Sequence, residues 1–204
     1  GANLWTIIWK VMLAESRTSL LVNATNKVAK FYKTEHIYMD LSQIFRYSDC
    51  SLLDGSKREI PKESYAEQLN ESEGEPVSTY VPFRNGLFIS AAASVALSKG
   101  CSVIYYGAHS DDAAGSAYPD CSDEFNSAIG QAVYIGSGKK LKIEAPFVNF
   151  TKADIVRTGI ELGVPYELTW SCYEGGEKPC GKCGTCIDRA RAFAENGVSD
   201  PALG

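Results

Sequence analysis

Four cysteines close together restrict the folds open to this chain more than any other segment does. The stretch "CYEGGEKPCGKCGTC" fills positions 172 to 186 and holds four of the seven cysteines in the 204-residue sequence. Their spacing is C-x7-C-x2-C-x2-C, and Gly181 and Gly184 each follow a cysteine directly. Glycine permits tight turns with positive φ. The segment therefore predicts a loop that brings four thiol groups to one point.

Converging thiolates indicate a tetrahedral zinc site, in which Zn–S distances of about 2.3 Å place the sulfurs about 3.7 to 4 Å apart. The predicted ligands are Cys172, Cys180, Cys183 and Cys186. Free core cysteines, disulfides and an iron–sulfur cluster remain as alternatives, since C-x2-C-x2-C also occurs in ferredoxins. All four positions are filled by protein, so the metal is expected to be structural. We expect residues 172–197, including a short helix, to form a zinc-binding C-terminal element.

The remaining composition indicates the compartment and the class of partner. Cys50, Cys101 and Cys121 are scattered singly, a pattern that favours a cytoplasmic metalloprotein over a secreted disulfide framework. The formal net charge is −5, which argues against a nucleic-acid partner because phosphate contacts dominate such binding. There is no run of 18 apolar residues, so no membrane span is expected. A small-molecule partner fits these observations best.

The first half of the chain predicts strand, helix, strand and a long loop. Residues 1–13 are apolar and indicate a buried strand, and the helical spacing of apolar residues in 18–33 indicates a helix. The segment "EHIYMDLSQIF" predicts a strand followed by a turn. Residues 48–78 are polar with little periodicity, and we expect a mobile loop there.

The second half alternates helix and strand more clearly. Helices are predicted at "RNGLFISAAASVALSKG", with Asn85 as cap and Gly100 as end, at "SDEFNSAIGQAVYIGSG" and at "TKADIVRTGIELG". The continuous apolar run "CSVIYYGAH" predicts a strand buried on both faces, and "LKIEAPF" another. This alternation predicts one α/β domain over 1–204, with a mainly parallel sheet and helices on both faces.

Ligands of open α/β sheets bind beyond the carboxyl ends of the strands. The loop there is "GAHSDDAAGSAYPDC", residues 107–121. Tyr118 offers a ring for stacking, and the carboxylates of Asp111, Asp112 and Asp120 are acceptors suited to the N–H edge of a guanine-like base. His109 has a side chain that transfers protons near neutral pH. The alternative is that these acidic residues are only a solvated turn.

Two basic residues are placed at helix starts. Arg84 in "TYVPFRNG" and Lys152 in "NFTKADI" each lie where a helix N-terminus and a cation together would bind a phosphate or carboxylate. Either one taken alone is also compatible with an ordinary surface residue.

Four motifs, "YVPFRNGLFIS", "GAHSDDAAGSAYPDCSDEF", "TKADIV" and "SCYEGG…CGKCGTC", occur in this order. Together they closely resemble the 7-cyano-7-deazaguanine synthases of the queuosine pathway, from about Glu35 to Val198. The resemblance implies a Rossmann-like, adenine-nucleotide alpha hydrolase-like fold of the PP-loop type and a structural zinc on the four cysteines. It also implies a homodimer that acts as an ATP-dependent C–N ligase, converting 7-carboxy-7-deazaguanine and ammonia to 7-cyano-7-deazaguanine.

The resemblance also suggests roles for the residues singled out above. Arg84, Lys152 and His109 are the expected catalytic residues, and the aspartates of the 107–121 loop and Tyr118 are expected to bind the base. ATP, accompanied by Mg²⁺, is expected at the start of the first helix, near the hydroxyls of Ser16, Thr18 and Ser19 and near Asn85.

The chain departs from the family at the loop that precedes this helix. Members carry S-G-G-x-D-S there, whose backbone N–H groups cradle the ATP phosphates. The corresponding place reads "VMLAESRTSLLV", and there is no glycine between Gly1 and Gly55. Three hypotheses therefore stand. The first is an active synthase, and the second is a catalytically impaired relative that binds the deazapurine but lacks a complete ATP site. The third is a different ATP-pyrophosphatase-type enzyme, such as one that modifies tRNA, against which the acidic net charge argues.

Overall fold

The computed structural model describes residues 15–53, 55–71 and 75–203, and the side chains from residue 23 onward. The predicted strand over 1–13 lies outside the described residues. The first half of the chain is helical, with α1 (Glu15–Phe31), α2 (Ser42–Phe45), α3 (Tyr65–Glu71) and α4 (Arg84–Ser98). The second half contains β1 (Val103–Tyr105), α5 (Ser110–Ala113), α6 (Asp123–Gly136), β2 (Lys142–Glu144), α7 (Lys152–Glu161) and α8 (Gly184–Glu195).

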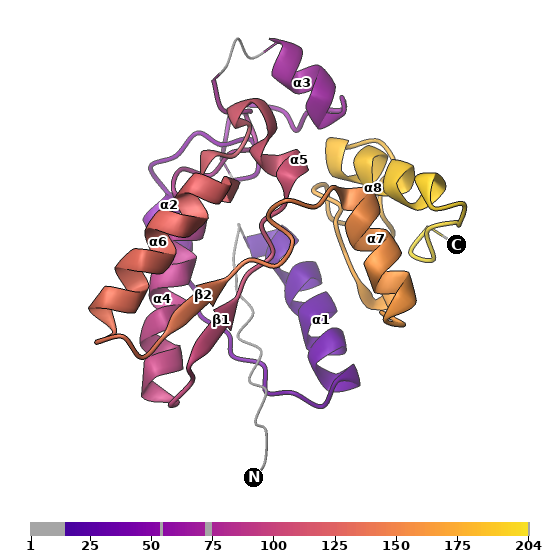
Figure 1. Ribbon diagram of the computed structural model, residues 1–204. Coiled ribbons are helices and arrows are strands. Elements are labelled where there is room, and N and C mark those ends of the chain that lie inside the picture. Colours follow the sequence, from indigo (N-terminus) through magenta and orange to yellow (C-terminus); the bar gives the residue numbers. More distant parts are fainter. Residues whose placement is uncertain (1–14, 54, 72–74, 204) are drawn as a thin grey trace.

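The two described strands form a parallel pair, as the sequence predicts. Val103 pairs with Lys142, and Tyr105 pairs with Glu144. Helix α4 contacts β1, α6 contacts β2, and the two helices contact each other; α7 packs against α8 in a second group of helices (Figure 1). Because the strands are parallel, both deliver their following loops to the same edge, toward α5 and α7.

Local capping signals are confirmed where they involve short-range contacts. Ser122 caps α6 by accepting a hydrogen bond from the backbone N–H of Phe125 at 3.1 Å. Thr151 and Asp154 form the predicted capping box at the start of α7. Gly100 follows α4 with a φ of 70°, a backbone conformation that glycine adopts at little cost.

The capping role predicted for Asn85 is wrong. Helix α4 begins one residue earlier, at Arg84, and its N-cap is Phe83, which makes no side-chain capping bond. The carboxylate of Asp120, distant in sequence, instead accepts a hydrogen bond from the Asn85 backbone N–H at 2.8 Å. A residue distant in sequence therefore binds a backbone N–H at the start of α4, a role that the sequence assigned to the Asn85 side chain.

Two other predictions in the first half need correction. Residues 35–41 form no strand; the Asp40 carboxylate accepts a hydrogen bond from the Ser42 backbone N–H at 2.8 Å and a short helix, α2, follows. Residues 48–78 are not a plain loop, because they include α3 and the buried side chains of Leu52 and Ile60. Their apolar residues are too irregularly spaced to show a period, yet they are buried. The mobility of this segment stays a prediction.

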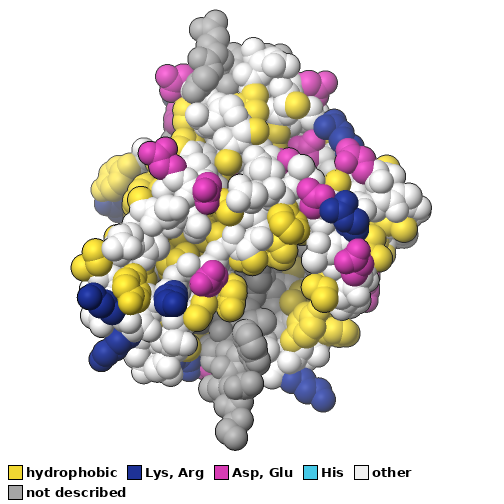
Figure 2. All heavy atoms as spheres, in the orientation of Figure 1, with side chains coloured by type: hydrophobic (Ala, Val, Ile, Leu, Met, Phe, Trp, Pro, Cys, Tyr) yellow, Lys and Arg dark blue, Asp and Glu magenta, His cyan; other side chains and the backbone are white. Residues whose placement is uncertain are grey.

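Strand β1 is less buried than its apolar sequence predicts, since Tyr105 is 59% exposed. Acidic and basic side chains are interspersed over the face shown in Figure 2. Among the described residues, no helix combines the length and the apolar composition that crossing a membrane requires.

The main hydrophobic cluster is built around the cysteine-rich segment. Three cysteines of this segment pack with side chains from the first half of the chain. The cluster consists of Phe45, Cys50, Leu52, Ile60, Val81, Cys172, Cys183 and Cys186. Burial of apolar side chains is the dominant favourable term in folding. The C-terminal element is therefore part of the main core rather than an appendage.

Candidate metal centre and active site

The four clustered cysteines converge as the sequence predicts. The sulfur atoms of Cys172, Cys180, Cys183 and Cys186 all lie within 4.8 Å of one another. The Cys180 and Cys186 sulfurs are 4.0 Å apart, which is close to the separation in a tetrahedral thiolate site. All seven cysteines are free thiols, so the disulfide alternative is wrong. The donor set and the spacing fit a metal ion.

Backbone N–H groups point at these sulfurs. The N–H of Cys180 donates to the Cys172 sulfur at 3.3 Å, and the N–H groups of Lys182 and Cys183 donate to the Cys180 sulfur at 3.5 and 3.3 Å. Hydrogen bonds to a charged group favour the charged form. The loop therefore folds so that its own backbone stabilises thiolates, which are the form that binds a metal.

The thiol pKa values show how the cluster without a metal affects ionisation of its cysteines. Burial raises the pKa of Cys172 and of Cys186. Burial also opposes ionisation of Cys183, but hydrogen bonds from Thr185 and from backbone groups outweigh it and bring its pKa to about 7. Four thiolates this close together repel one another, so a cation at their centre is what would let all four ionise together.

The segment before α3 lies directly against this cluster. Cys183 is the N-cap of α8, and the next residue, Gly184, begins the helix. A Cβ on Gly184 would lie 2.7 Å from the carbonyl oxygen of Glu63, so only glycine allows this approach. The N–H of Tyr65 also donates to the carboxylate of Asp188 on α8, at 3.3 Å. These contacts connect the cysteine loop to α3.

A second cluster forms where the loops after β1 and β2 meet. The Nζ of Lys152 lies 3.2 Å from Asp112 Oδ1, and Nε2 of His109 lies 3.3 Å from Asp112 Oδ2. Asp111 Oδ2 accepts a hydrogen bond from the Lys152 backbone N–H at 2.7 Å. The Ser110 hydroxyl donates to the Phe150 carbonyl at 2.7 Å and holds the two loops together. The structure thus brings together three predicted residues, His109, Asp112 and Lys152.

The surroundings of His109 define its protonation. Burial lowers its pKa; Asp112 opposes this shift and Lys152 adds to it. The ring is therefore neutral near pH 7. Because Nε2 faces a carboxylate, we assign the proton to Nε2. Its Nδ1 is buried and has no hydrogen-bond partner among the described residues, so this lone pair can accept a proton.

This lowered pKa makes stability depend on pH. The unfolded chain binds a proton at His109 more readily than the folded protein, so stability is full above pH 6.5 and falls as the pH drops below it. We expect His109→Gln to reduce the loss of stability between about pH 7 and pH 5.5. Urea denaturation at several pH values measures this. Parallel curves for the variant and the unmodified protein would contradict the assignment.

Asp120 and Asn85 form a buried contact at the start of α4. Asp120 is 4% exposed. Besides the bond from its backbone N–H to the Asp120 carboxylate, Asn85 donates from its side-chain Nδ2 to the Asp120 carbonyl at 3.1 Å and to the Cys121 sulfur at 3.2 Å. The side chain of Asn85 is therefore engaged within the protein.

Arg84 lies beside this contact with part of its side chain buried. Its Nε has no hydrogen-bond partner among the described residues. Burial opposes its charge, but the nearby Tyr173, Tyr118 and Asp120 outweigh this and raise its pKa. A buried guanidinium with an unsatisfied N–H is a donor ready for an anionic ligand.

Tyr118 does not offer the open stacking face that the sequence predicts. It is 3% exposed, with its ring edge-on to Tyr65 at 5.5 Å and to Tyr80 at 6.3 Å between centroids. Its hydroxyl hydrogen-bonds that of Thr79. The ring is covered because Tyr65 and Leu69 of α3 pack against it, whereas the sequence predicts a loop for that segment.

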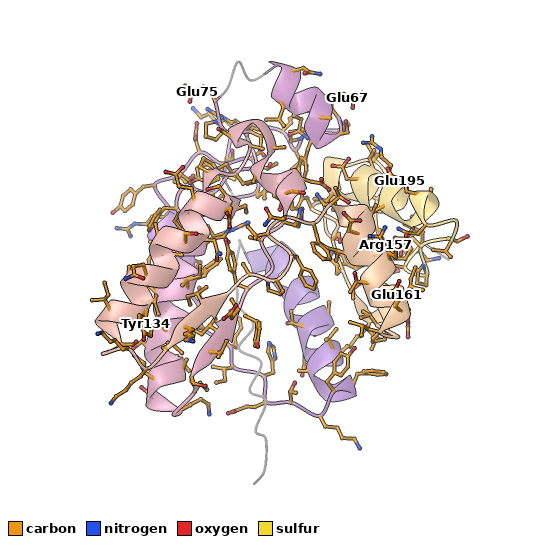
Figure 3. All side chains as sticks on the ribbon, in the orientation of Figure 1. Glu67, Glu75, Tyr134, Arg157, Glu161 and Glu195 are labelled. Atoms are coloured by element: carbon orange, nitrogen blue, oxygen red, sulfur yellow. The ribbon has the colours of Figure 1, made fainter. Side chains whose placement is uncertain are left out.

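Sequence reasoning missed Tyr65 and Tyr173. Their hydroxyl oxygens are 2.7 Å apart, and the Nζ of Lys152 lies 4.5 Å from the centre of the Tyr65 ring. The only sequence signal was the position of Tyr173 directly after Cys172, one of the four clustered cysteines. In Figure 3, Glu161 of α7 and Glu195 of α8 lie at the outer surface, and both residues are exposed.

The predicted ATP-binding residues Ser16, Thr18 and Ser19 lie in the first turns of α1, which begins at Glu15. Their side chains, and the turn before the helix, lie outside the described part of the chain. Their role stays a prediction.

Comparison with known proteins gives a consistent result. A family model described as "Queuosine biosynthesis protein QueC" matches residues 12–197. A protein of Archaeoglobus fulgidus named 7-cyano-7-deazaguanine synthase is 45% identical over 183 residues, which are 89% of this chain and 73% of the relative.

Two further proteins carry the same name. One from Caldicellulosiruptor bescii is 50% identical over 123 residues, 60% of this chain and 55% of that protein. One from Thermoplasma acidophilum is 40% identical over 191 residues, 91% of this chain and 76% of that protein. The family model covers most of the chain, including all four clustered cysteines and the His109, Asp112 and Lys152 cluster, and the chain belongs to the QueC family of queuosine biosynthesis proteins.

Proposed function

We propose that this chain is a 7-cyano-7-deazaguanine synthase, an ATP-dependent C–N ligase that converts 7-carboxy-7-deazaguanine and ammonia to the nitrile. The observation that carries the proposal is the meeting of His109, Asp112 and Lys152 at the loops that follow the parallel strands. Membership of the QueC family supports the substrate and the reaction.

The chemistry needs two activations. A carboxylate is a poor electrophile, so ATP first converts it to an acyl-adenylate and releases pyrophosphate. Ammonia attacks the acyl carbon, AMP leaves, and an amide forms after loss of a proton. A second ATP then adenylates the amide oxygen with release of pyrophosphate. Loss of that oxygen with AMP, and of the remaining protons from nitrogen, gives the nitrile.

The residues of the cluster suit these steps. Lys152 and Arg84 supply positive charge for the phosphates and for the oxyanion that develops as ammonia attacks. The buried Nδ1 of His109 is the acceptor for protons lost from nitrogen. One carboxylate oxygen of Asp112 contacts His109 and the other contacts Lys152, so Asp112 holds both side chains in place.

We assign base recognition to the aspartates of the 107–121 loop. The carboxylate of Asp111 accepts the backbone N–H of Lys152, and that of Asp120 accepts the backbone N–H of Asn85. Carboxylates held in this way are ordered acceptors for a guanine-like edge. Tyr118, whose hydroxyl contacts that of Thr79 and whose ring is buried, would form a wall of the site rather than an open stacking surface.

ATP with Mg²⁺ would bind at the start of α1, where Ser16, Thr18 and Ser19 lie. A helix N-terminus favours phosphate because its first N–H groups are unpaired. Zinc is the metal that we propose for the four cysteines, in a structural role, because all four ligands are thiolates. We also propose a cytoplasmic homodimer; the seven free thiols suit a reducing compartment.

The test is direct conversion by zinc-loaded protein. The protein is incubated with 7-carboxy-7-deazaguanine, ATP, Mg²⁺ and ammonium, and mass spectrometry follows the amide and the nitrile, with AMP measured in parallel. Reactions without ATP are the control. Absence of both products would overturn the proposal. Calorimetry that then shows binding of the deazapurine without binding of ATP would identify the catalytically impaired relative instead.

A further inference from the structure

Tyr173 lies between the metal centre and the basic cluster. It follows Cys172 directly in sequence, and its side chain packs against the hydrophobic cluster that contains Cys172, Cys183 and Cys186. The placement of the Tyr173 backbone is therefore set by the same loop geometry that gathers the four sulfurs.

The other end of Tyr173 reaches the catalytic candidates. Its hydroxyl oxygen is 2.7 Å from that of Tyr65. The Tyr65 ring lies under Lys152, with Nζ 4.5 Å from the ring centre, an attractive cation–π arrangement. Tyr65 is 5% exposed, and the side chain of Lys152 is 21% exposed. A continuous chain of contacts thus runs from the cysteine cluster through two phenols to the amine.

From this geometry we propose that Tyr173 is a positioning residue: it couples the metal-bound loop to Lys152 through Tyr65. The catalytic role of this coupling rests on the proposed function. The coupling itself, between the cysteine loop and the Lys152 amine, does not depend on it. With the loop ordered by metal, the Tyr173 hydroxyl holds the Tyr65 ring beneath the amine. Without metal, or without the Tyr173 hydroxyl, the Tyr65 ring is no longer held in place beneath the Lys152 amine.

The coupling is measured by the acetylation rate of Lys152 with N-hydroxysuccinimide acetate, followed by peptide mass spectrometry. Loss of a cation–π contact at a partly exposed site corresponds to about a two- to five-fold increase in rate. We expect this increase in Tyr173→Phe with metal bound, and in the unmodified protein after chelation. Chelation should add little in the variant, because the link is already cut.

Tyr65→Phe is the second variant, since it keeps the ring but breaks the same hydroxyl contact. It should raise the rate as Tyr173→Phe does, and the double variant should show no further increase. Tyr166→Phe is the matched control: it also removes a phenol, one that donates to the Ile155 and Val156 carbonyls at 3.1 and 3.2 Å. Lys142, which is exposed, serves as the internal reference.

Two outcomes would overturn the proposal. One is a Lys152 rate in Tyr173→Phe equal to that of the unmodified protein. The other is an increase in the Lys152 acetylation rate on chelation that is the same in Tyr173→Phe as in the unmodified protein. In the assay for nitrile formation we expect Tyr173→Phe to lower kcat and leave KM for the deazapurine near its original value. If the unmodified protein forms no nitrile, the proposed function fails while the acetylation result still decides the coupling.

Discussion

Replacing Cys183 by serine should abolish metal binding and destabilise the C-terminal element. The side chain of Cys183 is fully buried, with 0% exposed, it caps α8, and it lies in the same core cluster as residues from the first half of the chain. A structural zinc contributes about 10–16 kcal/mol to the folding of zinc-finger peptides. We expect the substitution to cost roughly 5 kcal/mol of stability, less than this full contribution, because the cysteine loop also packs in the hydrophobic core.

Three measurements check this result: metal content per chain, the midpoint of denaturation, and hydrogen exchange over residues 172–197. Cys101→Ser is the matched control, because Cys101 is also a free thiol but lies outside the cluster. Retention of one metal per chain in Cys183→Ser would rule against the site. A brown protein with visible absorption, containing iron in place of zinc, would restore the iron–sulfur alternative.

Lys152→Gln should reduce kcat for nitrile formation by about 10²- to 10³-fold, the usual cost of removing one group that stabilises developing negative charge. The amine lies 3.2 Å from Asp112 and over the Tyr65 ring, so its position is fixed before substrate binds. Glutamine is one atom shorter than lysine, keeps a polar end and removes the charge. Single-turnover kinetics at saturating ATP separate this step from substrate binding.

Lys142→Gln supplies the comparison, since Lys142 lies exposed on β2 and loses the same charge. Its rate should match that of the unmodified protein. An unchanged kcat in Lys152→Gln would show that the amine only completes the ion pair with Asp112. A fall confined to stability, with full activity per folded molecule, would give the same answer.

Contacts within a few residues were predictable from the sequence. The spacing of Cys180, Cys183 and Cys186 confines three sulfurs to one loop, and the Thr151–Asp154 capping box closes within one turn. Such contacts close only short loops of chain, which costs little conformational entropy. The local sequence pattern is therefore sufficient to specify them. The strand and helix order of the second half followed from periodicity for the same reason.

Predictions failed where a distant segment competed with a local one. Asn85 has the right chemistry for a cap, but Asp120 occupies the helix start instead. Tyr118 was expected to be open, but α3 covers it, and α3 came from a stretch without apolar periodicity. Local propensity cannot represent an interaction whose partner lies 35 residues away.

The sequence by itself determined the four cysteines of the candidate metal centre, the alternation of helix and strand in the second half, and the identity of the basic and acidic candidates. Only the tertiary structure decided that His109, Asp112 and Lys152 form one cluster and that Tyr65 and Tyr173 connect it to the cysteines. The physical reason is that residues 65, 109, 152 and 173 meet only after parallel strands and the cysteine loop have packed together. That packing depends on buried surface shared by the whole chain, which no short segment specifies.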